Sequence, residues 1–233
     1  MSAPSPGSDP ESLTRVARAA LAHVADGMVL GLGTGRAAEA FIQALGERVR
    51  GGLRVSGVPT SNRSAELARK LGIEVRSLDE VQRVDVAFDG ADEVTPDLSL
   101  TKGLGGALLR ERVVASEADR FIVLVTPEKM VDKLGSRTPI PIEVVPFASP
   151  TVIRRLRKAG GVPVVRAKAD GFPYFTDNGN LIVDTGFGPI DDPAALDVVI
   201  RRIPGVVDHG IFLGMAHLVL VAEDAGVREL RRG

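Results

Sequence analysis

The segment from residue 89 to residue 115 brings together several side chains that can do chemistry. Its sequence, DGADEVTPDLSLTKGLGGALLRERVVA, places four acids before a lysine, follows the lysine with a glycine-rich turn, and then begins a predicted helix. The acids and the lysine are Asp89, Asp92, Glu93, Asp97 and Lys102. Such a set suits metal binding, phosphate binding or acid/base chemistry on a small polar substrate, and the segment alone does not choose among them.

Asp89 and Asp92 follow an apolar run that predicts a strand, and open parallel sheets place their ligand crevices at the carboxyl ends of strands. Two carboxylates three residues apart can point into one small volume. A divalent cation and aspartates that bond their own turn are the alternatives. No nearby histidine supports a transition metal, and Lys102 would compete with a cation for the carboxylates.

Two glycine turns are candidate anion sites. Gly31-Leu32-Gly33-Thr34-Gly35 joins a predicted strand to a predicted helix, where N–H groups and the positive end of the helix dipole converge. Its spacing matches neither a dinucleotide fingerprint nor a P-loop, so a turn that only needs positive φ is about as well supported as a phosphate site. Arg36 shifts the balance toward phosphate, because a guanidinium can bind two phosphate oxygens.

The second turn, residues 103–106, follows Lys102 and leads into the next predicted helix. Glu111 lies on that helix between two arginines and, from the sequence pattern alone, is a solvated surface residue. Together, the acids, the lysine and the two turns favour a pocket for a small, phosphorylated, polyhydroxylated molecule.

Composition narrows the classes of protein. The chain has 233 residues, 44% hydrophobic and 25% charged, which is enough for one large domain or for a domain plus a smaller one. A net charge of −1 with scattered arginines gives no footprint for nucleic acid. No stretch approaches the roughly 20 apolar residues of a membrane span, and the start lacks a secretory signal, so we expect no membrane partner and a cytoplasmic protein. The absence of cysteine excludes disulfides, thiolate metal sites and a cysteine nucleophile.

The elements that must position these groups alternate between short apolar runs and amphipathic segments from Leu13 to Val125, which predicts β-α-β units in a parallel sheet. The predicted strands are 28–35, 53–60, 73–78, 85–90, 98–103 and 121–125, and the predicted helices are 11–24, 37–49, 61–72 and 106–120.

The pattern changes after Pro127. Residues 138–150 are too rich in proline for a central strand, so we expect them to cross into a second unit. That unit is predicted as a helix (151–161), a strand (162–168), a hairpin turning at 177–179, and a helix capped by Asp192; residues 210–224 are predicted to return to the first sheet. The predicted organisation is a disordered leader (1–12), a Rossmann-like catalytic domain (13–134 plus 209–233) and a small α+β domain (135–208).

The chain resembles the type A ribose-5-phosphate isomerases over almost its whole length. The resemblance rests on the ordered blocks GLGTG, TSNRSAELARKLGI, DGADEV, TKGLGGALLRERVVA, the lysine in TPEKMVDKLG, PIPIEVVPF, TDNGNLIVD and IPGVVDHGIF. It implies an α/β fold, a Rossmann-like parallel sheet domain with an inserted, smaller, ferredoxin-like α+β domain. It also implies an aldose–ketose isomerase of the non-oxidative pentose phosphate pathway. That enzyme interconverts D-ribose 5-phosphate and D-ribulose 5-phosphate through an enediolate, without cofactor or metal, as a homodimer or homotetramer.

The resemblance also assigns roles by position. Glu111 corresponds to the general base, Asp89 and Asp92 to groups that bind the substrate hydroxyls and assist ring opening, and Lys102 to the group that stabilises the enediolate oxygens with the amides of residues 103–105. The remaining residues that the resemblance places against the substrate are Thr34, Gly35, Arg36, Ala37, Gly90, Ala91, Gly103, Leu104, Gly105 and Lys129.

Three positions depart from the family pattern. The usual G-T-G-S-T turn is GTGRA here, and Leu104 interrupts a normally all-glycine run. The basic residue often found in the first helix has no clear equivalent, since Leu13 and Thr14 occupy the region and Arg15 is a candidate substitute. We predict that Arg36 binds the phosphate in place of the two lost hydroxyls.

Two rival functions stay open: an isomerase or lactonase for another sugar phosphate, and a sugar-phosphate sensor without turnover. His209 and His217 lie in late apolar segments and are predicted to be buried or edge residues.

Overall fold

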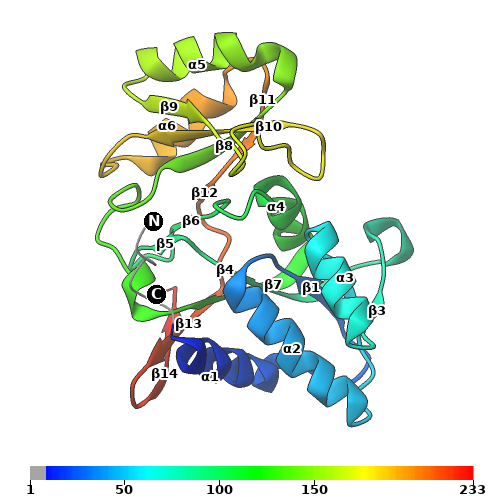
Figure 1. Ribbon diagram of the computed structural model, residues 1–233. Coiled ribbons are helices and arrows are strands. Elements are labelled where there is room, and N and C mark those ends of the chain that lie inside the picture. Colours follow the sequence, from blue (N-terminus) through cyan, green and yellow to red (C-terminus); the bar gives the residue numbers. More distant parts are fainter. Residues whose placement is uncertain (1–8, 233) are drawn as a thin grey trace.

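The computed structural model describes residues 9–232, which form a seven-stranded sheet with helices on both faces and a smaller four-stranded sheet beside it (Figure 1). Residues 1–8 of the predicted leader lie outside the described residues. The first helix, α1, begins at Pro10, earlier than the expected domain start at Leu13.

The large sheet has the strand order β14-β13-β7-β4-β1-β2-β3, and its pairs are parallel except β13 with β14. Strands buried on both faces explain the nearly continuous apolar runs in this part of the sequence. The strands are β1 Val29–Leu32, β2 Ser56–Pro59, β3 Glu74–Val75, β4 Val84–Gly90, β7 Ala118–Val125, β13 Leu218–Glu223 and β14 Gly226–Arg231. The predicted return of the C-terminal segment to this sheet is confirmed by β13, whereas β14 was not predicted.

Helices cover both faces of the large sheet. One face packs alternate strand residues against α1 Pro10–Ala20, α2 Arg36–Arg50 and α3 Asn62–Lys70, and Phe41 of α2 stacks on Phe88 of β4 with ring centroids 4.1 Å apart. The other face packs against α4 Leu108–Glu117. Figure 1 shows α4 between the large and small sheets, so residues on this helix can reach both.

The predicted strand at 98–103 is present, but it does not join the parallel sheet. Strand β6 Leu100–Thr101 pairs antiparallel with β5 Glu93–Val94 and with β12 Ile211–Phe212 in a separate three-stranded sheet. The physical reason is length: only residues 91–99 separate β4 from β6, and a parallel neighbour needs a crossover of about a dozen residues or more.

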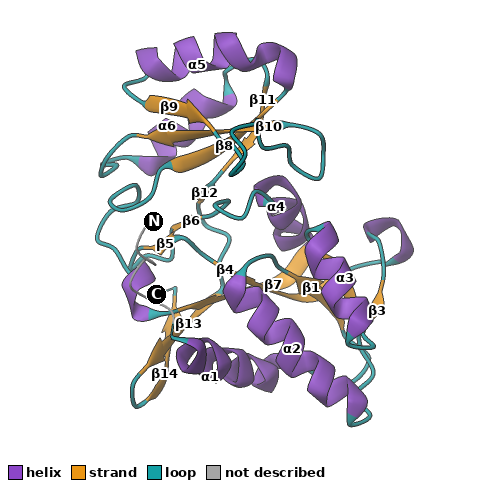
Figure 2. Cartoon of the chain, in the orientation of Figure 1, coloured by secondary structure: helices purple, strands orange, loops and turns teal. Residues whose placement is uncertain are grey.

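The small sheet has the order β11-β8-β10-β9 and is antiparallel throughout, with α5 Ser149–Lys158 and α6 Pro193–Arg201 on one face (Figure 2). Its strands are β8 Ile140–Val144, β9 Val162–Val165, β10 Leu181–Gly186 and β11 Val206–His209. The chain order β8-α5-β9-β10-α6-β11 is the ferredoxin-like arrangement that the resemblance implies. Asp192 caps α6 as predicted, its carboxylate accepting from the N–H of Ala195.

One prediction about this unit was wrong. Residues 140–144 form the central strand β8, between β10 and β11, despite Pro141. Pro141 has no N–H to donate toward the β11 side, where its carbonyl accepts from Gly210. The carbonyl of Gly210 instead accepts from the N–H of Lys102 at 2.8 Å, so no acceptor is left without a donor. The helix predicted over 106–120 was also too long, because residues 118–120 belong to β7.

Short 3-10 turns complete the connections. They are η1 Leu21–His23, η2 Leu78–Glu80, η3 Pro127–Lys129 and η4 Pro146–Ala148. The turn η3 follows β7 directly and carries Lys129 to the carboxyl end of the large sheet.

Candidate active site

A cavity of about 260 Å³ lies where β1, β4 and β6 end. The residues that line it all belong to the set that the sequence indicated: Thr34, Gly35, Arg36, Ala37, Gly90, Ala91, Asp92, Lys102, Gly103, Leu104, Gly105, Glu111 and Lys129. Asp89, the remaining residue of that set, does not line the cavity but contacts Lys102 beside it. The fold therefore brings together residues from four separate segments of the chain.

Lys102 is the centre of this cluster, with a side chain only 2% exposed. Its Nζ donates to the carbonyl of Gly90 at 2.6 Å and lies 3.0 Å from Asp89 Oδ2 and 3.4 Å from Glu111 Oε2. Burial lowers the pKa of this ammonium, but the two carboxylates outweigh burial and raise the pKa above its ordinary value. Lys102 is therefore a fixed positive charge in a site with little water.

Asp89 is held by main-chain groups as well as by Lys102. Its Oδ1 accepts from the N–H of Thr34 at 3.1 Å and from that of Gly90 at 2.7 Å. Burial raises the pKa of Asp89, against the opposing effects of Lys102 and these amides. Gly33 permits the close approach, because a Cβ there would lie 2.3 Å from the Asp89 carboxylate. The glycine of the first turn is thus explained by contact with Asp89 and not by phosphate alone.

Glu111 is not the solvated residue that the sequence pattern alone indicated. It is 4% exposed, on the inner face of α4, while its neighbour Arg112 points toward β11 and binds Asp208. Its Oε2 has no hydrogen-bond partner among the described residues. Burial, followed by repulsion from Asp89, raises the pKa of Glu111 to about 8. A carboxyl group with a pKa near neutrality, an oxygen that accepts no hydrogen bond from the described residues, and a neighbouring ammonium is suited to moving protons.

Asp92 connects the acids to the second glycine turn. Its Oδ2 accepts from the N–H of Leu104 at 3.0 Å, and burial raises its pKa. Leu104, a departure from the family pattern, is 41% exposed and also lines the cavity, so the leucine does not bury its side chain in the core. Gly103 and Gly106 adopt φ of 104° and 79°, which a side chain would strain.

The first glycine turn ends at the start of α2. Gly35 is the N-cap residue, with φ of 104°, and Arg36 and Ala37 begin the helix at the rim of the cavity. The hydroxyl of Thr34 does not point to an empty site: its Oγ1 lies 2.7 Å from Thr60 Oγ1 and 2.8 Å from Ser61 Oγ. The hydroxyls of Thr60 and Ser61 therefore hold the Thr34 side chain and fix the first glycine turn. The sequence analysis did not predict this role, because nothing in the TSN block indicates it.

Other candidates from the sequence lie elsewhere. Glu93 is fully buried and accepts from the amides of residues 135, 137 and 138, so it anchors a loop. Arg15 binds the carbonyl of Glu223 and does not line the cavity. His209 is buried, as predicted, and burial followed by two nearby arginines lowers its pKa to about 3. His217 is exposed and accepts through Nδ1 from the N–H of Phe121.

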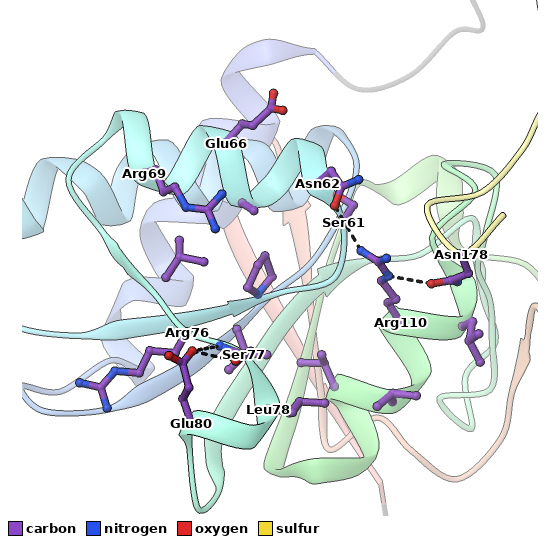
Figure 3. Close-up of a pocket in the computed structure, with 17 residues that line it drawn as sticks. Ser61, Asn62, Glu66, Arg69, Arg76, Ser77, Leu78, Glu80, Arg110 and Asn178 are labelled. Atoms are coloured by element: carbon purple, nitrogen blue, oxygen red, sulfur yellow. Dashed lines mark hydrogen bonds between the residues drawn. The ribbon is translucent and has the colours of Figure 1, made fainter.

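A second, larger cavity of about 820 Å³ opens between α3, η2 and the outer face of α4 (Figure 3). At its edge Arg110 donates to Asn178 at 2.8 Å and to the carbonyl of Asp177, and its Nη1 lies 3.4 Å from Asn62 Oδ1 (Figure 3). Asp177 also accepts from the N–H of Asn62 at the start of α3. The predicted hairpin turn at 177–179 thus ties the small sheet to the large one.

No helix over residues 9–232 is long and apolar enough to span a membrane. Within the same range, no group of three or more histidine, cysteine or acidic side chains is arranged to hold a metal ion.

Comparison with known proteins gives a consistent result. Residues 56–226 match the family model of ribose 5-phosphate isomerase A (phosphoriboisomerase A). A ribose-5-phosphate isomerase A from Thermomicrobium roseum is 52% identical over 94% of this chain and 92% of its own length, and one from Roseiflexus castenholzii is 51% identical over 93% of each. Among solved structures, a ribose 5-phosphate isomerase A from Methanocaldococcus jannaschii superposes with a TM-score of 0.92 at 45% identity, over 96% of this chain and all of the other. A D-ribose-5-phosphate isomerase in complex with phospho-erythronic acid gives 0.94 at 42% identity, over 97% of this chain and all of the other.

Proposed function

Since the chain belongs to the ribose 5-phosphate isomerase A family, we propose that its cavity at the ends of β1, β4 and β6 is where the isomerase reaction takes place. The chain is an aldose–ketose isomerase that interconverts ribose 5-phosphate and ribulose 5-phosphate, a reaction of the pentose phosphate pathway. The observation that carries the proposal for the site is Glu111: a buried carboxyl whose Oε2 accepts no hydrogen bond from the described residues and forms an ion pair with the ammonium of Lys102 at 3.4 Å.

In the proposed mechanism Glu111 is the base. Its carboxylate takes the proton from C2 of the open-chain aldose, the C1–C2 enediolate forms, and the same carboxyl returns the proton to C1. The hydroxyl proton moves from O2 to O1 as the carbonyl changes place, so atoms and charge balance. A pKa of about 8 leaves Glu111 able both to accept and to give up a proton near neutral pH.

Lys102 and the second glycine turn stabilise the charge that develops on the oxygens. An ammonium already fixed by Gly90, Asp89 and Glu111 needs no reorganisation when the enediolate forms. Asp92, which lines the cavity, binds the sugar hydroxyls and assists ring opening, while Asp89 holds the Lys102 ammonium in place beside the cavity. Arg36, Lys129 and the amides at the start of α2 hold the phosphate, since all of them line the same cavity.

The test is turnover of D-ribose 5-phosphate by the purified chain in a chelator, beside Glu111→Gln. The substitution keeps the shape of the side chain and removes the base, so kcat should fall by on the order of 10²- to 10⁴-fold. The neighbouring Arg110→Met, which alters the outer face of the same helix, is the control and should stay within a few-fold of wild type. A Glu111→Gln enzyme that keeps its activity would refute the role of Glu111.

The assay also separates the rival function. A sensor would bind ribose 5-phosphate without turnover, and binding alone requires no buried carboxyl with a raised pKa. Phospho-erythronic acid, present in the structure of one relative, carries a carboxylate in place of the reacting carbons, and we propose that it inhibits this chain competitively with ribose 5-phosphate.

We further propose that the chain is a homodimer or homotetramer. The support is apolar surface around the edge strand β9: Val162 is 70% exposed, Val164 62%, Phe172 69% and Phe175 49%. Light scattering should give a mass of two or four chains, and Val164→Lys should lower that mass; a monomeric wild type would contradict the proposal.

A cytoplasmic location is also proposed, because a sugar phosphate carries charge that a bilayer excludes. Fractionation of cells tests it.

A further inference from the structure

The second glycine turn, residues 103–106, is contacted by side chains of the unit that contains the small sheet. Three side chains of that unit contact it. A Cβ on Gly103 would lie 3.2 Å from Pro141, one on Gly106 would lie 2.3 Å from the hydroxyl of Tyr174, and Arg166 donates to the carbonyls of Gly103 and Leu104. Arg166 is the only one of the three whose contacts with the turn are charged hydrogen bonds.

Arg166 itself is well fixed. It follows β9, its N–H donates to the carbonyl of Ile182, and its carbonyl accepts from the N–H of Tyr174. Asp184 on β10 lies on the same face of the sheet, because it pairs with Val164 in register. The guanidinium binds the Asp184 carboxylate through Nε at 2.8 Å and Nη2 at 2.5 Å, and the two side chains are only 15% and 21% exposed. This bidentate pair leaves Nη1 directed at the turn.

Nη1 lies 3.1 Å from the carbonyl oxygen of Gly103 and 2.9 Å from that of Leu104. In a trans peptide the C=O and the following N–H point in opposite directions. A Gly103 carbonyl directed at Arg166 therefore turns the N–H of Leu104 away from it, toward Asp92. In the same way, the Leu104 carbonyl turns the N–H of Gly105 to the cavity side, and Gly105 lines the cavity.

Glycine makes this turn easy to rearrange. Gly103 and Gly106 have positive φ, and each peptide unit between them has a glycine on at least one side. If either carbonyl turned inward, it would present negative charge to an enediolate where an N–H should be. The Gly103 carbonyl also accepts from the N–H of Gly106 at 2.9 Å within the turn, whereas the Leu104 carbonyl is held outward by Arg166, whose guanidinium, fixed by a carboxylate, can bind both acceptors.

We infer that Arg166 is a positioning residue for the isomerase reaction: it holds the carbonyls of Gly103 and Leu104 outward, so that the amide of Leu104 donates to Asp92 and the amide of Gly105 faces the reacting oxygens. This role rests on the proposed function of the cavity. It makes the small sheet part of the catalytic apparatus, acting through the turn, although Arg166 does not itself line the cavity.

The test compares Arg166→Met, Arg166→Lys and Arg110→Met. Arg110 also joins the two sheets but contacts no residue of the turn, so Arg110→Met measures the loss of a bridge alone. Because the amide of Gly105 acts on charge present only in the transition state, Arg166→Met should lower kcat by on the order of 10- to 100-fold while KM for ribose 5-phosphate changes less than about threefold. Arg166→Lys keeps the charge without the fork and should give an intermediate kcat with the same KM.

Inhibition by phospho-erythronic acid gives a second measurement. Its Ki should rise in parallel with the loss of kcat in the Arg166 variants and stay at the wild-type value in Arg110→Met. Thermal melts establish that each variant is folded, and Arg166→Lys decides the question if Arg166→Met is not. Wild-type kcat in either Arg166 variant, or equal losses in Arg166→Met and Arg110→Met, would overturn the inference. An inactive wild type would instead overturn the proposed function on which it rests.

Discussion

The pH dependence of the reaction is the sharpest test of the charge arrangement around Glu111. The perturbation is Asp89→Asn, which keeps an oxygen to accept from the amides of Thr34 and Gly90 but removes the negative charge. In the wild type, burial and the charge of Asp89 raise the pKa of Glu111 from 4.5 to about 8. Removing that charge also frees Lys102 to act on Glu111 alone, so both effects lower the pKa of the base.

The size of the expected rise in kcat/KM of the wild type follows from the titration equation for a single base. A base with a pKa of about 8 is roughly one-tenth ionised at pH 7 and roughly nine-tenths ionised at pH 9, so kcat/KM should rise about tenfold between these values. The second ionisation of a phosphate ester, near pH 6, is nearly complete before this range begins and does not obscure it. In Asp89→Asn the rise should move to lower pH, even though the maximal rate falls.

The assay is the initial rate of ribulose 5-phosphate formation at low substrate across pH 5 to 10, at constant ionic strength. Glu111→Gln serves as the control, because its residual rate should not show the rise that belongs to Glu111. A wild-type profile that is flat between pH 7 and 9, or whose rise centres near the ordinary carboxyl value, would refute the reasoning. So would an Asp89→Asn profile that does not move, or that moves to higher pH.

Three further predictions concern single contacts. Because the pKa of Glu111 is raised in the folded state, its contribution to stability is fully present below pH 4.5 and is lost as the pH rises through about 8. The melting temperature of the wild type should therefore fall relative to that of Glu111→Gln between pH 5 and 9. A difference between the two melting temperatures that stays constant over this range would contradict the prediction. Arg36→Ala should raise KM for ribose 5-phosphate about tenfold with little change in kcat, and an unchanged KM would remove Arg36 from phosphate binding. Gly33→Ala should destabilise the fold by about 1–3 kcal/mol in urea unfolding, because its Cβ would meet the Asp89 carboxylate at 2.3 Å, and wild-type stability would show that the turn relaxes.

Much of the fold could be predicted because local pattern and topology agree. The periodicity of 37–49 predicted α2, and the helix predicted over 61–72 is α3, at whose start the hydroxyl of Ser61 accepts from the N–H of Ser64. Prediction was wrong where pairing depends on distant residues. Pro141 indicated a crossing segment, and only the bond between Gly210 and Lys102 explains why a proline fits a central strand there.

The residues of the candidate site also divide into those that the sequence could predict and those that it could not. Acids and glycines at strand ends could be found from residue type and spacing, since the carboxyl edge of a parallel sheet brings them together. Glu111 could not be separated from a surface glutamate by its neighbours, because its burial depends on which face of α4 meets the sheet. Arg166 is one of many arginines, and its importance comes from a contact between residues more than sixty positions apart along the chain.

The bond from the N–H of Lys102 to the carbonyl of Gly210 has a consequence for how the chain is made. Residue 210 leaves the ribosome long after residue 102, and β13, which follows it, inserts between β7 and β14. A nascent chain can form the strands from β1 to β7 early, but it lacks the partner of the Lys102 main-chain N–H until synthesis is almost finished. Products of premature termination before residue 210 would lack β13 and expose the edge of β7 to one another.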